Sequence, residues 1–209
     1  MKHPLVLPVL LLAFSGSAVG SEDASCSYDR EALLSLSEQA FDQDLSGGGG
    51  GWRKIANILR CERAAAELIG AYRAKHRNNS SALMWHEGQL WAEVNEYEKA
   101  IPLLEGSKKK EAEDPIGWNH YVDATVAFLR SDRAGLERSR EALSKVPYTP
   151  ASGFPPIKDG YIEIAGQEGQ PLFKMRWPPN IEVVDGLARC FGEPYSEAYS
   201  SPSCRAPVQ

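Results

Sequence analysis

Apolar residues recur at mostly helical spacing from residue 27 to residue 146, with polar residues between them. This pattern is typical of amphipathic helices that bury one face, and it predicts a mainly α-helical fold. The first expected helix covers residues 27–45, with Ser27 as its N-cap. The second covers residues 52–76 and has an apolar stripe that begins at Trp52.

Five consecutive glycines, residues 47–51, separate these two predicted helices. Glycine populates many backbone conformations, so a run of glycines does not continue a helix. A phosphate-binding loop would need a Lys-Ser/Thr pair after the glycines and a strand before them, and the sequence has neither. We therefore expect a flexible connector over residues 46–51.

Residues 82–107 predict two helices joined by a short turn. An Asn-Glu pair interrupts the first helix, and Tyr97 opens the second. The small residues Gly88 and Ala100 would let the two helices approach closely, because the distance between packed helices depends on the side chains at their contact. The segment therefore predicts a tightly packed helical hairpin.

This hairpin resembles one tetratricopeptide repeat (TPR), a pair of helices A and B in which a small residue of helix A faces helix B. Gly88 holds the small position, and Tyr97 opens helix B with the Tyr-x-x-Ala spacing of the family. The sequence departs from the pattern at Glu87, where leucine is usual, and at Ser107, where alanine is usual. The resemblance implies a TPR-like stack of helical hairpins over residues 21–146.

A second helical hairpin is expected further along the chain. Asp114-Pro115 begins a helix that apolar residues extend to Leu129, and Ser131-Asp132 then provides a turn and an N-cap. Another helix follows until Pro147, because proline does not continue a helix. The two hairpins would lie next to each other in the stack.

The composition changes after residue 146, where prolines become frequent and exclude long helices. Residues 161–164 and 172–177 alternate between apolar and polar side chains, which predicts a β-hairpin. Asn180 is expected to cap a short helix of residues 181–191. We expect residues 147–209 to form a small αβ cap that covers the end of the helical stack.

The N-terminus has the pattern of a signal peptide over residues 1–20. Lys2 precedes an apolar run, residues 4–14, and small residues then lead to a plausible cleavage site before Ser21. We therefore expect the protein to be periplasmic or secreted. Since no later stretch approaches ~18 consecutive apolar residues, the mature chain is not expected to span a membrane.

The cysteine content agrees with export. The chain has four cysteines, and an even number in an exported protein predicts disulfides. Three pairings are possible, and proximity in the sequence favours Cys26–Cys61 and Cys190–Cys204. A zinc or thioredoxin-like site is poorly supported, because the sequence has no Cys-x-x-Cys pair.

Charge and motifs narrow the classes of function. The formal net charge is −5, so the chain lacks the basic surface of a nucleic-acid-binding protein. The sequence contains no His-Glu-x-x-His and no Gly-x-Ser-x-Gly motif, and nothing in it indicates a cofactor. A protein or peptide partner is the interaction that the TPR resemblance implies.

The candidate site comes from placing the A helices of the two hairpins side by side, which would line a concave groove with their inner faces. Six residues would then combine aromatic surface with hydrogen-bonding groups, as a peptide-binding groove does. These residues are Trp85, His86, Gln89, Asn119, His120 and Asp123.

Other interpretations of the same residues stay open. His86, His120 and Asp123 could serve a periplasmic or secreted hydrolase, or a metal-binding enzyme. The helix faces could also be simply solvated, in a structural exported protein held together by its disulfides.

Overall fold

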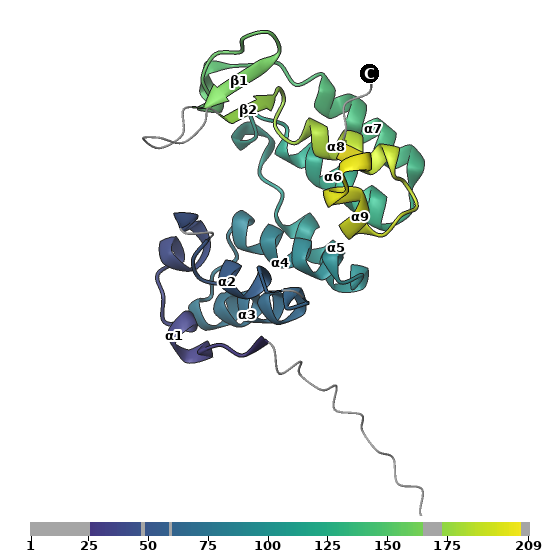
Figure 1. The fold of residues 1–209 in the computed structure, drawn as a ribbon. Helices are drawn as coiled ribbons and strands as arrows, with labels where there is room; N and C mark the ends of the chain where they lie inside the picture. Colours follow the sequence, from purple (N-terminus) through teal and green to yellow (C-terminus); the bar gives the residue numbers. More distant parts are fainter. Residues whose placement is uncertain (1–25, 47–48, 59, 165–172, 206–209) are drawn as a thin grey trace, which may run out of the picture.

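The computed structural model describes residues 26–46, 49–58, 60–164 and 173–205. These residues form mainly helices, together with a small antiparallel β-hairpin and further helices at the C-terminal end (Figure 1), as the sequence predicts. The predicted signal peptide, Gly47 and Gly48 of the connector, and the loop of the β-hairpin lie outside the described residues. In the described part of the chain, no helix has the length and apolar character needed to cross a bilayer.

The prediction of one continuous helix over residues 27–45 is wrong. The structure has α1 (Arg30–Leu34) and then a short π-helix, η2 (Gln39–Gln43). Asp29 rather than Ser27 caps α1, because the Asp29 carboxylate accepts a hydrogen bond of 3.0 Å from a backbone N–H in the first turn.

Two serines lie where the predicted helix breaks. The Ser35 hydroxyl donates to the backbone carbonyl of Ala32 at 2.7 Å. The Ser37 hydroxyl accepts from the backbone N–H of Ala40 at 3.3 Å. Hydrogen bonds of this kind offer the backbone an alternative to the helical ladder, so the apolar spacing alone was an insufficient guide.

The second predicted helix, over residues 52–76, is also interrupted. The structure has α2 (Arg53–Ala56) and α3 (Glu62–His76). Between them Arg60 adopts a left-handed backbone conformation, with φ of 68°. Because a left-handed residue does not fit within a right-handed α-helix, the chain changes direction before α3 begins.

The described glycines of the predicted connector are buried rather than open to solvent. The backbone N–H of Gly50 donates to the carbonyl of Asp44 at 2.7 Å. Gly51 has a φ of 53°, and a Cβ atom at this position would overlap the backbone of Phe41. The expectation of a flexible connector is therefore corrected for residues 49–51, where the glycines allow one backbone to pack directly on another.

The predicted hairpin of residues 82–107 is confirmed by α4 (Ser81–Glu93) and α5 (Tyr97–Gly106). A Cβ atom on Gly88 would lie 2.9 Å from the Leu104 side chain and 3.2 Å from the Ala100 carbonyl oxygen. Glycine at this position therefore lets the two helices approach as closely as the sequence predicts.

Two polar side chains lie inside this part of the fold, and both have partners. The Glu87 carboxylate of α4 forms an ion pair with Arg73 of α3. The hydroxyl of Ser107, which is fully buried, donates to the carbonyl of Leu104 at 2.6 Å. Burial of these groups is tolerated because each retains a hydrogen bond.

The second hairpin consists of α6 (Trp118–Leu129) and α7 (Arg133–Ser144). Asp132 caps α7 as predicted, since its carboxylate accepts from the N–H of Gly135 at 2.8 Å. The start of α6 differs from the prediction of a helix from Asp114-Pro115. Asp114 instead accepts hydrogen bonds of 2.6 and 2.8 Å from the first two N–H groups of α6, and so caps the helix from a preceding turn.

The C-terminal region begins with a short 3₁₀-helix, η5 (Pro150–Ser152), and the predicted β-hairpin follows, in which β1 (Tyr161–Ile164) pairs antiparallel with β2 (Phe173–Arg176). The predicted helix follows as α8 (Ile181–Arg189), which packs against α6 and α7. Two short helices that the sequence did not predict, α9 (Tyr195–Ser200) and α10 (Pro202–Arg205), then pack against α8.

The start of α8 also differs in detail from the prediction. Asn180 precedes the helix, but its side chain makes no capping hydrogen bond and its backbone is left-handed, with φ of 66°. Asparagine tolerates this conformation better than most residues. Asn180 therefore provides the turn into α8 rather than a side-chain cap.

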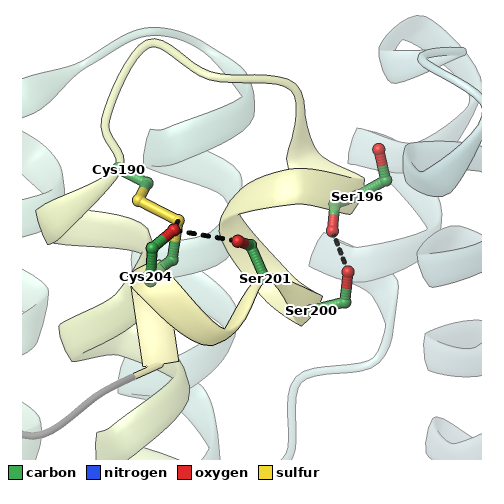
Figure 2. The surroundings of a disulfide bond; sticks show 6 residues. Cys190, Ser196, Ser200, Ser201 and Cys204 are labelled. Atoms are coloured by element: carbon green, nitrogen blue, oxygen red, sulfur yellow. Dashed lines mark hydrogen bonds between the residues drawn. A yellow bond between two sulfur atoms is a disulfide. The ribbon is translucent and has the colours of Figure 1, made fainter.

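The four cysteines, all within the described residues, form the pairs that proximity favours. The sulfur atoms of Cys26 and Cys61 are 2.01 Å apart, and those of Cys190 and Cys204 are 1.99 Å apart. The first disulfide joins the segment before α1 to the residue before α3. The second joins the end of α8 to α10 and so encloses α9 between its two ends (Figure 2).

Candidate functional site

An aromatic cluster connects Trp85 of α4 to the first turn of α6. The ring centroid of Trp85 lies 4.8 Å from that of Trp118 and 4.6 Å from that of Tyr121. Trp85 is only 5% exposed, so it belongs to the core between the two helices. Trp85, one of the six predicted groove residues, therefore supports the surface from within the core and is not accessible to a ligand.

His86 is held by a buried carboxylate from the N-terminal region. Its Nδ1 atom lies 2.7 Å from Asp42 Oδ1, and Asp42 of η2 is fully buried. The same oxygen accepts from the indole N–H of Trp52 at 2.8 Å, and the Arg53 guanidinium lies 3.9 Å away. The ring of His86 also packs at a tilt against Trp52, with 5.2 Å between centroids.

These contacts set the charge state of Asp42. Burial acts to raise the pKa of Asp42, but the hydrogen bonds from His86 and Trp52 and the electrostatic attraction of His86 and Arg53 outweigh it, and the pKa lies below its usual value. Asp42 is therefore a carboxylate that orients the His86 ring. Sequence reasoning missed Asp42, because a helix over residues 27–45 gave no sign that this position is buried.

A carboxylate–histidine pair is one element of general-base catalysis. In the described part of the chain, however, no serine, threonine or cysteine side chain forms a hydrogen bond with His86. The described residues also contain no group of three or more His, Cys, Asp and Glu side chains that could hold a metal ion. Among the described residues, the geometry thus supplies an oriented histidine that has no hydrogen-bonded nucleophile.

The predicted residues of α6 contact the loop that precedes the helix. Asn119 bonds both backbone groups of Lys109, accepting from its N–H and donating to its carbonyl, each at 2.8 Å. Asp123 forms an ion pair with Lys108. His86 and Asp123, which the enzyme hypothesis combines, therefore have separate partners, while His120 is half-buried on the same helix.

Gln89, the remaining predicted residue, lies beneath the C-terminal segment. Helix α4 contacts α9, and Gln89 has a small lowering effect on the pKa of Tyr195. Tyr195 is 1% exposed, and its ring lies 6.3 Å from that of Phe128 of α6. Burial raises the pKa of Tyr195 well above its usual value, with smaller contributions from the neighbouring Tyr121, Tyr199 and Glu93. Tyr195 is accordingly a neutral anchor of α9.

A second tyrosine of α9 contacts the same surface. Tyr199 stacks on Tyr195 with 5.4 Å between centroids and packs against the hydrophobic core. Burial raises the pKa of Tyr121 well above its usual value, and Tyr199 adds to the shift. Both tyrosines of α9 therefore face the core of the protein.

Helix α8 completes the surface on which α9 lies. A Cβ atom on Gly186 of α8 would lie 3.3 Å from the carbonyl of Ala198 and 3.2 Å from that of Cys204. Figure 1 shows α9 next to α6 and α8, and α9 also contacts α4. We call this surface the covered face. It consists of Phe128 of α6, whose ring meets that of Tyr195, Gly186 of α8, and the part of α4 that contacts α9.

Glu93 is a titratable group at the edge of the covered face. Burial raises its pKa to about 7, and the negative charge of Glu62 in α3 contributes to the shift. Its own charge also raises the pKa of Tyr195 in α9. The sequence offered no signal for Glu93, because an acidic residue near a helix end is usually solvated.

Comparison with known proteins gives no relative for the chain: no family model, no curated protein and no solved structure matches it.

Proposed function

We propose that the protein is an exported, TPR-like scaffold that binds a peptide or protein segment on the surface formed by α4, α6 and α8. The single observation that carries the proposal is α9 itself, a helix already docked on these three helices through a fully buried tyrosine. A surface that accepts one amphipathic helix has the shape and polarity for helix-in-groove recognition.

The arrangement of the hairpins supports the TPR-like part of the proposal. In it, α4 and α6 take the role of A helices, and α5 and α7 that of B helices. Gly88 fills the small-residue position that lets A and B approach, and the two departures from the family pattern have internal partners, Glu87 with Arg73 and Ser107 with a backbone carbonyl. The fold therefore tolerates these departures.

The disulfides support export, because such bonds persist in oxidising compartments such as the periplasm or the extracellular space. Beyond α9, the half-buried His86 and His120 and the more exposed Asp123 leave polar groups on α4 and α6 for a partner to contact. Binding to this surface would use hydrogen bonds around an aromatic centre.

A site-specific crosslinking experiment tests the proposed function. A photo-reactive amino acid replaces His120 on α6 in one variant and Arg138 on the exposed face of α7 in a control variant. Each variant is irradiated in the native extracellular or envelope fraction. We expect a discrete crosslinked partner from position 120 and none from position 138. The same products from both positions, or none from position 120, would contradict a binding role for α6.

A further inference from the structure

The contacts of α9 describe the ligand that the covered face accepts. Tyr195 is fully buried against Phe128, and Tyr199, one turn later, stacks on Tyr195 and packs against the hydrophobic core. Residues four apart lie on the same side of a helix, so both rings point to one surface. The covered face therefore holds two aromatic side chains at positions i and i+4.

The position between these two tyrosines is restricted to a small residue. Ala198, at i+3, is fully buried, and α8 approaches its backbone so closely that a Cβ atom on Gly186 would lie 3.3 Å from its carbonyl oxygen. A larger side chain at i+3 would need volume that the fully buried Ala198 position does not offer, because close-packed interiors do not accept added volume without strain. By contrast Glu197 at i+2 is exposed and makes no such contact.

A hydrogen bond from the backbone fixes how the segment lies. The backbone N–H of Tyr195 donates to the Tyr97 hydroxyl at 3.1 Å. Buried aromatic rings are typical of strong anchors at interfaces. The buried ring of Tyr195 is therefore the main anchor of the segment.

The second disulfide keeps α9 in place from both ends. Cys190 lies directly after α8 and Cys204 lies in α10, so the bond closes a short loop around α9 (Figure 2). A tethered segment competes with a free ligand at an effective concentration on the order of millimolar. A free partner therefore meets a surface that the chain's own segment already occupies.

We infer that the covered face is a recognition site for a helical peptide with the pattern aromatic-x-x-small-aromatic, and that α9 is the chain's own copy of this ligand. The inference deepens the proposed binding function and rests on it. The partner is a segment of another protein that presents two aromatic rings one turn apart with a small residue between them. It replaces α9, and the disulfide limits how readily it does so.

The test uses the full chain and a labelled synthetic peptide of residues 193–205 with Cys204→Ser. The receiving chain carries Cys190→Ser, Cys204→Ser and Tyr195→Ala, which open the disulfide and remove the internal anchor. Fluorescence anisotropy should show saturable binding of the peptide to this chain. Binding to the unmodified, oxidised chain should be at least tenfold weaker, because its own α9 competes.

Two altered peptides test the pattern itself. Ala198→Leu and Tyr195→Ala in the peptide should each weaken binding at least tenfold, whereas Glu197→Gln, at the exposed position, should leave it unchanged. Equal binding of all these peptides would overturn the inference. So would the absence of binding by a receiving chain whose circular dichroism matches that of the unmodified chain.

If the triple variant does not fold, the chain with Tyr195→Ala and an intact disulfide serves as the receiver. The predicted ranking of peptide affinities and the contradicting results are the same. Light scattering accompanies both titrations. The receiving chain could instead dimerise by exchanging C-terminal segments and bind no free peptide. This result would assign the covered face to a second copy of the chain and overturn the inference. If the peptide does not bind but position 120 still crosslinks to a partner, only the inference is contradicted. The proposed scaffold function is then unaffected.

Discussion

The backbone N–H of Tyr195 in α9 donates a hydrogen bond of 3.1 Å to the hydroxyl of Tyr97, which opens α5. The two residues are separated by 98 positions in the sequence, so this bond fixes the C-terminal segment to the turn between α4 and α5. Because Tyr195 is almost fully buried, the bond satisfies a backbone group that has little access to water.

Replacing Tyr97 by phenylalanine should weaken this attachment. The Tyr97→Phe substitution keeps the ring and removes the acceptor of the Tyr195 N–H, which costs about 1–2 kcal/mol in the free energy of unfolding. Urea denaturation followed by circular dichroism measures the change. The control is Tyr161→Phe, since Tyr161 is 40% exposed on the β-hairpin and should change stability by less than about 0.5 kcal/mol. Equal effects of both substitutions would argue against the docking of α9.

Glu93 should make stability depend on pH. Its pKa is about 7 in the folded chain and is raised by burial and by Glu62, while its usual value is 4.5. The folded state therefore binds this proton more tightly than the unfolded state, and stability falls as the pH rises from 4.5 to 7. Tyr195 of α9 lies close to the same carboxyl.

The Glu93→Gln variant removes this titration. It should match the unmodified chain near pH 4.5 and exceed its free energy of unfolding by about 2 kcal/mol at pH 8. Denaturant titrations at the two pH values provide the measurement, with Glu98→Gln on the exposed side of α5 as the control. A variant that loses stability at pH 8 would mean that Glu93 is not penalised by burial.

Asp42 should have the opposite pH dependence. Its pKa is lowered, because the bonds from His86 and Trp52 and the nearby charges overcome the effect of burial. Its contribution to stability is therefore present above the usual value of 3.8 and disappears as the pH falls through the lower folded-state pKa.

The Asp42→Asn variant should lose about 2–4 kcal/mol in the free energy of unfolding at pH 7, because it leaves buried donors beside a neutral amide. The difference from the unmodified chain should shrink near pH 3. Glu105→Gln, which breaks a surface pair with Arg130, should cost at most about 1 kcal/mol. A loss at Asp42 no larger than at Glu105 would contradict the buried pair with His86.

The elements that depend on local pattern could be predicted from the sequence. The α4–α5 hairpin follows from Gly88, Ala100 and Tyr97, and the β-hairpin follows from alternation over residues 161–164. Both signals lie within a few residues of the element they specify, so no distant contact is needed to interpret them. The pairing of nearby cysteines belongs to the same group.

The elements that depend on distant contacts could not be predicted. The apolar pattern of the sequence gives Asp42 a surface position. Only its contact with His86, 44 positions later in the chain, makes it a buried partner. Similarly, residues 195–200 are too short and polar to be recognised as a helix, and α8 together with the second disulfide holds them in place. Trp85 looked like a ligand contact because sequence spacing does not distinguish a groove from the core beneath it.

The glycine run tests the difference between a segment determined by local sequence pattern and one determined by contacts with distant residues. Gly51→Ala introduces a Cβ atom against the backbone of Phe41 at a φ of 53°, and should cost at least about 2 kcal/mol. Gly192→Ala is the matched control, because Gly192 has a φ of 101° but no atom within 4 Å of an added Cβ. Thermal unfolding should therefore show a larger decrease in Tm for Gly51→Ala. A flexible connector at this position would tolerate Gly51→Ala without loss.

Hydrogen exchange at the backbone amide of Tyr195 tests most directly whether α9 is docked on α4, α6 and α8. The structure gives this amide an acceptor in the Tyr97 hydroxyl and buries the ring beside it, so it should exchange at least a hundredfold more slowly than in the isolated peptide of residues 193–205. Tyr97→Phe should remove most of this protection. Exchange in the unmodified chain at the rate of the isolated peptide would contradict the docked α9 and the recognition site derived from it.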